Sequence, residues 1–176
     1  MALSPNVVVV ATGDLITAQH LNNVRSNLDR IDNRVTAAHR SGTWTPSLTG
    51  MNIGSGGGAG LSASYAYTDG ILAIDVVAVM GSTGASVTGA ITFTLPAGFV
   101  ASRVNASILA PLQVSMTAGG SFQVGVAAVT SAGVVTIYAA TGGAYVGRAA
   151  TSATVPATWA AGNLFGCQGV LKGTLP

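Results

Sequence analysis

From Thr43 to Pro176 the sequence consists of short runs of Gly, Ala, Ser, Thr and Val in which apolar and polar residues alternate. This period of two is typical of β-strands, and Gly-rich turns separate several of the runs. We expect about eight or nine strands and no second helix. The clearest strands are expected at 61–68, 71–80, 85–95, 107–116, 121–130, 134–140, 144–150 and 164–171. Residues 43–176 are therefore predicted to form a mainly β head domain, an antiparallel β-sandwich of the jelly-roll kind.

The segment 61–80 carries the clearest hairpin signal in the chain. Asp69-Gly70 separates two apolar runs, and Asp-Gly suits a type I′ turn, in which both central residues have positive φ. The second run, 71–80, is apolar on both faces, so we expect the core on one side and another subunit on the other. Asp75 lies within this run and would need a cation to form a buried ion pair. The candidate cations are Arg103, Arg148 and Lys172.

Charged residues make up only 7% of the chain, whereas about 25% is ordinary. Glu is absent, and the charged side chains after Gly42 are limited to Asp69, Asp75, Arg103, Arg148 and Lys172. A monomer usually needs a charged surface to stay unassociated. We therefore expect this part to bury surface against copies of itself or within a larger assembly; a soluble monomer covered by Ser and Thr is the alternative. The isolated cations argue against nucleic-acid binding, and no run of about 18 apolar residues supports a membrane span.

The segment 17–41 has a different period and holds six of the twelve charged residues of the chain. Its apolar residues recur at spacings of three and four, which is the a/d pattern of a coiled coil. Thr17 is the expected N-cap, with Asp14 and Thr12 as alternative starts, and Ser41-Gly42 is expected to end the helix. Leu at position a with a β-branched residue at d favours three or four strands. Self-association is the first interpretation; docking on another protein and packing within the chain are the alternatives. The seam residues are Leu21, Val24, Leu28, Ile31 and Val35.

Residues 1–16 are predicted to form an extended docking arm. Four consecutive valines cannot alternate with polar residues, so both faces of such a strand would be covered: Val7, Val8, Val9 and Val10. A strand of this kind suits pairing with the sheet edge of a neighbouring chain, or folding back on its own domain. The N-terminus lacks a basic segment and its apolar run is short, so no signal peptide is expected.

We find no residue set that would support catalysis, a cofactor or a metal. His20 and His39 lie beside the seam, and Cys167 is expected to be a small buried side chain. The glycine-rich stretch 54–60 lacks the residues of a phosphate loop and is expected to be a flexible loop. Scattered aromatic residues are expected in the core or, alternatively, on a carbohydrate-binding surface. They are Trp44, Trp159, Tyr65, Tyr67, Tyr138 and Tyr145.

Several motifs resemble those of structural proteins of tailed bacteriophages. In GDLITAQHLNNVRSNLDRI (13–31) a Thr-Ala step precedes a Leu-Asn pair and an Arg-x-Asn-Leu turn of helix. The match is carried by Gly13, Asp14, Thr17, Ala18, Leu21, Asn22, Arg25, Asn27 and Leu28. Four later stretches are similar to the trimeric β-sandwich heads of phage fibre and decoration proteins. These are GTWTPSLTG (42–50), YAYTDGILAIDVVAVM (65–80), GAITFTLPAGF (89–99) and PATWAAGNLFGCQGVLKG (156–173).

The resemblance implies a non-enzymatic virion protein that forms a homotrimer. Its arm and helix would dock on the particle, against the major capsid protein or another virion protein, and its β head would face outward. A capsid decoration or short head fibre is the first expectation. A tail-associated module that recognises a host-surface carbohydrate is the alternative.

Overall fold

The computed structural model describes residues 18–102, 110–141 and 147–176. The chain divides into two compact units, which meet between Arg40 and Ser41. The first unit contributes the helix, and the second is a β unit with its own hydrophobic core.

Helix α1 (Ala18–Ala38) covers 21 residues, and the predicted N-cap, Thr17, lies outside the described residues. The helix ends three residues before the predicted Ser41, because the chain passes directly into strand β1 (His39–Thr43). The ring nitrogen Nδ1 of His39 lies 3.2 Å from the carbonyl oxygen of Val35. The last carbonyl groups of a helix have no partner within the helix, so this contact satisfies one of them.

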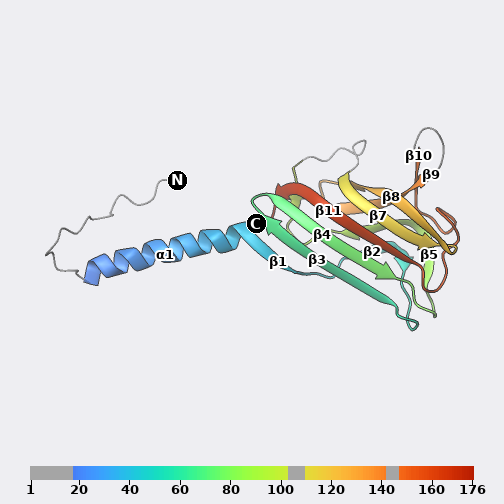
Figure 1. The fold of residues 1–176 in the computed structure, drawn as a ribbon, viewed down its shortest axis with the longest axis horizontal. Coiled ribbons are helices and arrows are strands. Elements are labelled where there is room, and N and C mark those ends of the chain that lie inside the picture. The colour runs from blue at the N-terminus through green and yellow to red at the C-terminus, as the bar shows by residue number, and fades with distance from the viewer. Residues whose placement is uncertain (1–17, 103–109, 142–146) are drawn as a thin grey trace. The chain divides into compact units, whose positions relative to one another are not determined.

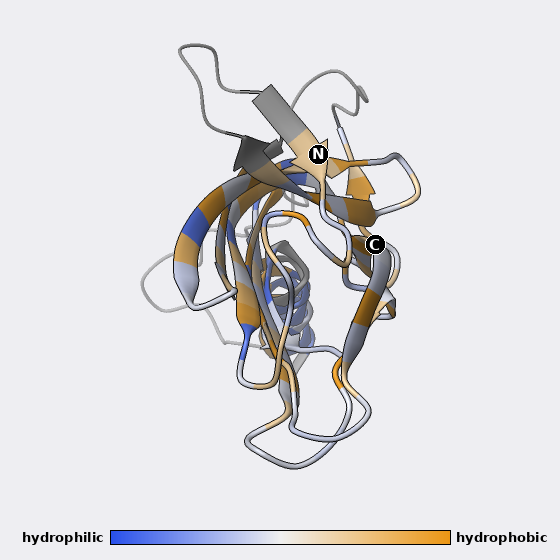
Figure 2. Ribbon diagram, turned by 90° about the vertical axis from the view of Figure 1, so that its right-hand side faces the viewer, coloured by the Kyte–Doolittle hydropathy of each residue, from blue (hydrophilic) through white to orange (hydrophobic). Residues whose placement is uncertain are grey.

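Among the described residues, nine strands lie side by side in one sheet in the order β1-β3-β4-β11-β7-β8-β9-β5-β2 (Figure 1). Two short strands extend it, since β10 pairs with β9 and β6 pairs with β11. The sheet curls around a single core (Figure 2). The mainly β character is confirmed, whereas the predicted two-sheet jelly roll is not, because the strands belong to one curled antiparallel sheet. The remaining strands are β2 (Leu48–Asn52), β3 (Gly60–Thr68), β4 (Ile71–Val79), β5 (Ser86–Thr94), β6 (Val100–Ala101), β7 (Ala110–Ala118), β8 (Ser121–Val129), β9 (Val134–Thr141), β10 (Gly147–Ala150) and β11 (Leu164–Thr174).

The predicted hairpin is confirmed as β3 and β4. Asp69 and Gly70 have φ values of 47° and 83°, as a type I′ turn requires. Strand β4 continues the sheet by pairing with β11 along its full length, from Ile71 opposite Lys172 to Val79 opposite Leu164. This hairpin therefore sets the register of the central part of the sheet.

The core lies on the inner face of the curled sheet. Strand β4 contributes alternate residues from Leu72 to Ala78, all of them buried, and β11 contributes Phe165 and Cys167. The ring of Phe165 stacks on Phe93 of β5, with 6.3 Å between ring centroids. Strands β11 and β5 are separated by three other strands in the order of the sheet, so this contact joins its two halves through the core.

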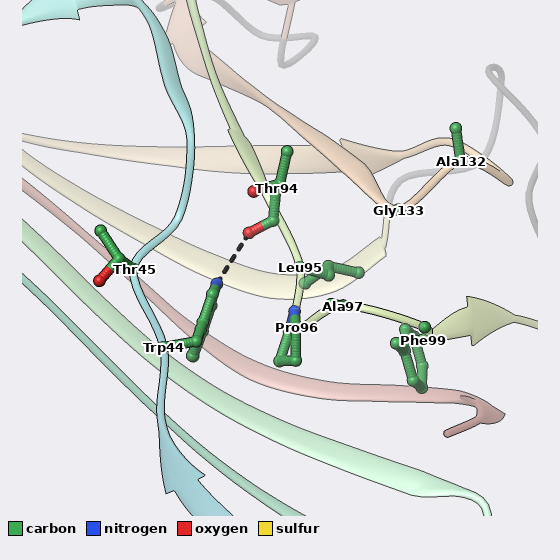
Figure 3. A pocket seen from close by; sticks show the side chains of 10 residues that line it. Trp44, Thr45, Thr94, Leu95, Pro96, Ala97, Phe99, Ala132 and Gly133 are labelled. Carbon is green, nitrogen blue, oxygen red and sulfur yellow. Dashed lines mark hydrogen bonds between the residues drawn. The ribbon is translucent and has the colours of Figure 1, made fainter. Parts of the chain in front are cut away.

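Trp44 ties together the two ends of the strand order. The stretch 42–50 runs from the end of β1, through a link, into β2, and these two strands lie at opposite ends of the sheet. In the link between them, the backbone N–H of Trp44 donates to the carbonyl oxygen of Ala63 on β3, at 3.2 Å. Its indole N–H donates to the carbonyl oxygen of Thr94 on β5, at 2.9 Å (Figure 3). One residue thus bonds to both halves of the curled sheet.

Candidate functional site

The helix seam is the first candidate surface. Its five members, Leu21, Val24, Leu28, Ile31 and Val35, are each 45–60% exposed. Apolar side chains in an a/d row gain free energy only when a partner covers them. The predicted docking arm, with Val7 to Val10, lies outside the described residues.

Asp75 does not occupy the buried position that we predicted from the sequence. Its side chain is exposed, because it lies on the outer side of β4, away from the core. Its neighbours on the adjacent strands are Ser64 and Gln168. The prediction of a buried ion pair was therefore wrong for the single chain. Lys172, one of the three candidate partners, is exposed in β11 on the same side of the sheet; Arg103 lies outside the described residues, as does the side chain of Arg148.

The second candidate surface is the outer face, by which we mean the solvent side of strands β3, β4, β11, β7 and β8, with β6 at its end. Every large apolar residue of the β unit that is exposed among the described residues lies on this face. Their exposed fractions run from 46% to 70%. They are Ile71, Val100, Phe122, Val124 and Val170. The expectation that β4 is covered by the core on one side and needs a cover on the other is consistent with this arrangement.

A groove of about 360 Å³ lies on the outer face between β11, β7 and β8. The glutamine side chains of Gln113 and Gln168 line it, and their residues are directly opposite each other in the sheet. Ser115 adds a hydroxyl group, and Phe122, 70% exposed, adds an aromatic ring. Amide and hydroxyl groups beside an exposed ring can bind a neutral polar ligand. Nothing in the sequence analysis pointed to these residues.

A second pocket, also about 360 Å³, lies beside Trp44 and is lined by Pro96, Phe99 and Gly133 among others (Figure 3). The polar group of its one indole is already used, because that N–H donates to Thr94. Phe99 is buried in the core. We therefore interpret this pocket as space beside the structural hydrogen bond between Trp44 and Thr94.

The aromatic residues named in the sequence analysis lie mainly in or against the core. Tyr67 and Trp159 are buried, and Trp44 and Tyr65 pack against the core with their rings edge to face, 6.1 Å apart. Tyr145 lies outside the described residues. These positions favour the core interpretation over a sugar-binding row built from these particular rings.

Cys167 is fully buried, as predicted. Burial, with a smaller contribution from the charge of Asp75, raises the pKa of its thiol from 9.0 to about 12. The thiol is therefore neutral and unreactive near neutral pH.

Within the part of the chain that the structure describes, no three His, Cys, Asp or Glu side chains gather in a group that could hold a metal ion. The described helix is not long and apolar enough to cross a membrane.

Comparison with known proteins yields a likeness in fold. No family model matches the sequence, and no curated protein matches it. Among solved structures, the chain is similar to the crystal structure of the Dettilon tailspike protein, with a TM-score of 0.50 and 16% sequence identity over 77% of this chain. This chain spans 24% of that one, so the likeness concerns one part of a larger protein. At this identity the match shows a shared fold.

Proposed function

We propose that this protein is a non-enzymatic structural component of a tailed-phage virion, which acts as a homotrimer. Its arm and helix attach to the particle, against the major capsid protein or another virion protein, and its β unit faces outward. Two findings support the proposal: the fold resembles part of a phage tailspike, and the sequence motifs resemble phage fibre and decoration proteins. Attachment through three identical arms would multiply weak contacts.

The observation that carries the proposal is the pair of uncovered apolar surfaces on one chain. The helix seam exposes five apolar side chains, and the outer face exposes five more. Only 7% of the residues are charged, so few charges oppose association. Large exposed apolar patches mark interaction surfaces in soluble proteins.

Sedimentation equilibrium of the purified protein tests the trimer. We expect a mass of three times the 17.3 kDa chain at micromolar concentration. A mass of 17.3 kDa at micromolar concentrations would refute the proposed trimer. The number of copies per virion then separates the two finer roles, because a capsid decoration is present in dozens to hundreds of copies and a tail tip in a handful.

Removal of residues 1–40 tests the docking role. The cut follows the boundary between the two units, and the β unit keeps its own core. We expect the truncated protein to stay folded and to lose binding to particles that lack the protein. If the truncated protein still decorates such particles, the arm and helix are not the docking segment.

The groove near Phe122 favours a second candidate function, a tail-associated module that recognises a host-surface carbohydrate. The exposed ring can stack on a sugar, and the amides of Gln113 and Gln168 can bond to its hydroxyl groups. In this case Phe122→Ala should abolish binding of the purified protein to host cells, while Val100→Ala, on the same face outside the groove, should not. If Phe122→Ala binds host cells as well as Val100→Ala does, the groove is not the carbohydrate-binding site.

A further inference from the structure

We propose that the outer face packs against the outer faces of neighbouring copies of this chain, with Asp75 of one copy opposite Lys172 of the partner subunit. This inference rests on the self-association in the proposed function, and it assigns that association a surface and a specific contact.

The chemistry of the exposed side chains indicates that a protein surface, and not a sugar, covers the outer face. Four of the five exposed apolar residues are aliphatic: Ile71, Val100, Val124 and Val170. Aliphatic surface gains free energy when apolar surface covers it, in proportion to the area removed from water, whereas a sugar presents mainly hydroxyl groups. The single ring of Phe122 can serve a sugar, but the aliphatic residues spread over β4, β6, β8 and β11 require a wider apolar partner.

The size of the face matches that of a stable protein interface. It spans five adjacent strands, four of nine residues and one of eleven. Strands lie about 4.8 Å apart and rise about 3.3 Å per residue, so the footprint is about 24 by 30 Å, or ~700 Å². A typical interface buries about 800 Å² on each partner.

The two charges of the face make it complementary to itself. Asp75 and Lys172 are the charged residues of these five strands, and they have opposite signs. Lys172 is paired with Ile71, four residues along β4 from Asp75. At about 3.3 Å per residue this offset is about 13 Å, too far for an ion pair within one chain. In a threefold ring of copies, Asp75 of each copy can therefore lie opposite Lys172 of the next copy.

Because of the helix, the outer faces need only a modest affinity for one another to associate. Helix α1 passes directly into β1, so copies that associate through their helix seams hold their β units at high effective concentration. The polar residues among the apolar ones, including Gln113, Gln168 and Ser115, can then form hydrogen bonds between copies. A covered face also closes the groove near Phe122, so this inference and the carbohydrate function exclude each other.

Disulfide trapping in the full-length protein tests the contact. In the double variant Asp75→Cys/Lys172→Cys, the two cysteines of one chain lie about 13 Å apart along the sheet, and a disulfide needs Cα atoms within about 7 Å. Any bond between them must therefore join two chains. Cys167 is buried with a raised thiol pKa and should not compete. Oxidation uses copper phenanthroline, and each single variant is the control.

We expect covalent dimers and trimers on non-reducing gels from the double variant, and monomers from each single variant. Sedimentation is measured on the same samples before oxidation. Oligomers that yield no covalent species would overturn the inference and leave the proposed function standing. A monomeric wild-type protein would overturn both.

A charge exchange provides an independent readout. Asp75→Lys alone and Lys172→Asp alone should each weaken association by about tenfold or more, because each places like charges opposite each other. The exchange of both should restore association to within about threefold of wild type. Ser131→Lys, in the exposed turn after β8, should leave it unchanged. If the exchanged protein associates no better than the single variants, Asp75 does not face Lys172.

Discussion

Met116 on β7 occupies the space that a side chain at position 125 on β8 would fill. A Cβ atom placed on Gly125 would lie 2.8 Å from the terminal methyl of Met116 and would clash with the carbonyl oxygen of Tyr138. Because Gly125 leaves the inner side of β8 open, the neighbouring strand supplies the core there. The larger residues of β8, Phe122 and Val124, then lie on the opposite side and form part of the outer face.

We therefore expect Gly125→Ala to lower the free energy of unfolding by about 1–3 kcal/mol, since overpacking forces neighbours to move. The backbone oxygen of Tyr138 cannot move aside without disturbing the pairing of β8 with β9. Urea denaturation measures the change. Gly89→Ala in β5 is the matched control: no atom lies within 4 Å of its added Cβ, so its stability should stay within about 0.5 kcal/mol of wild type. Equal effects of the two substitutions would contradict the packing argument.

Trp44→Phe should lower the free energy of unfolding by about 1–3 kcal/mol, because the carbonyl oxygen of Thr94 loses the indole N–H that bonds to it across the strand order. Trp159→Phe is the control, because its indole N–H donates only to Val155, four residues away. Thermal unfolding of both variants gives the comparison. A loss from Trp159→Phe as large as that from Trp44→Phe would show that the bond to Thr94 adds no particular stability.

Thr151 completes the ladder between β5 and β9. The two strands pair only from Thr92 to Thr94, and beyond that point the buried hydroxyl of Thr151 lies between them. It accepts from the backbone N–H of Ile91 at 2.8 Å and donates to the carbonyl oxygen of Ile137 at 3.2 Å. A side chain thus replaces a missing backbone pairing in the core.

Thr151→Val keeps the shape of the side chain but removes the acceptor of the Ile91 N–H, whereas the carbonyl oxygen of Ile137 keeps its bond from the backbone N–H of Thr151. We expect a loss of about 2–4 kcal/mol in the free energy of unfolding. Thr151→Ser keeps the hydroxyl and should cost less than half as much. Chemical denaturation distinguishes them, and similar losses from Val and Ser would mean that the methyl group, not the hydroxyl, is what matters at this position.

The sequence was sufficient where the determining contacts are local. The a/d spacing predicted α1, and Asp69-Gly70 predicted the hairpin of β3 and β4, because a helix period and a two-residue turn depend on neighbours in the chain. The burial of Cys167 also followed from its residue type.

The sequence was insufficient where distant segments decide the outcome. Trp44 meets Thr94, and Thr151 meets Ile91, across separations of 50 and 60 residues. The outward side of Phe122 depends on Met116 filling the core above Gly125, which alternation within β8 alone cannot reveal. Asp75 was assigned to a buried position because its strand is apolar on both sides, yet one of those sides is exposed in the single chain.

Cys167 should make the stability of the β unit depend on pH above about 9. The pKa of its thiol is about 12 in the folded protein and near 9.0 when solvated, so the folded state holds more protons between these values. The stabilisation is complete below pH 9.0 and is lost as the pH rises toward 12, by up to about 1.4 kcal/mol per pH unit. Cys167→Ala should lack this part of the slope. Urea titrations at several pH values between 8 and about 11 measure it, and identical slopes would show an ordinary thiol.

Leu28→Asp tests whether the helix seam faces its own copies. Leu28 occupies the central a position of the seam, so in a trimer the substitution places three carboxylates side by side in a dehydrated core. We expect the concentration for half-dissociation to rise by at least about 100-fold, measured by sedimentation. Ser26→Asp adds the same charge at the exposed position f and should leave the mass unchanged. If both variants sediment as the wild type but Leu28→Asp no longer binds particles, the seam contacts the particle, and the outer face of the sheet alone holds the copies together.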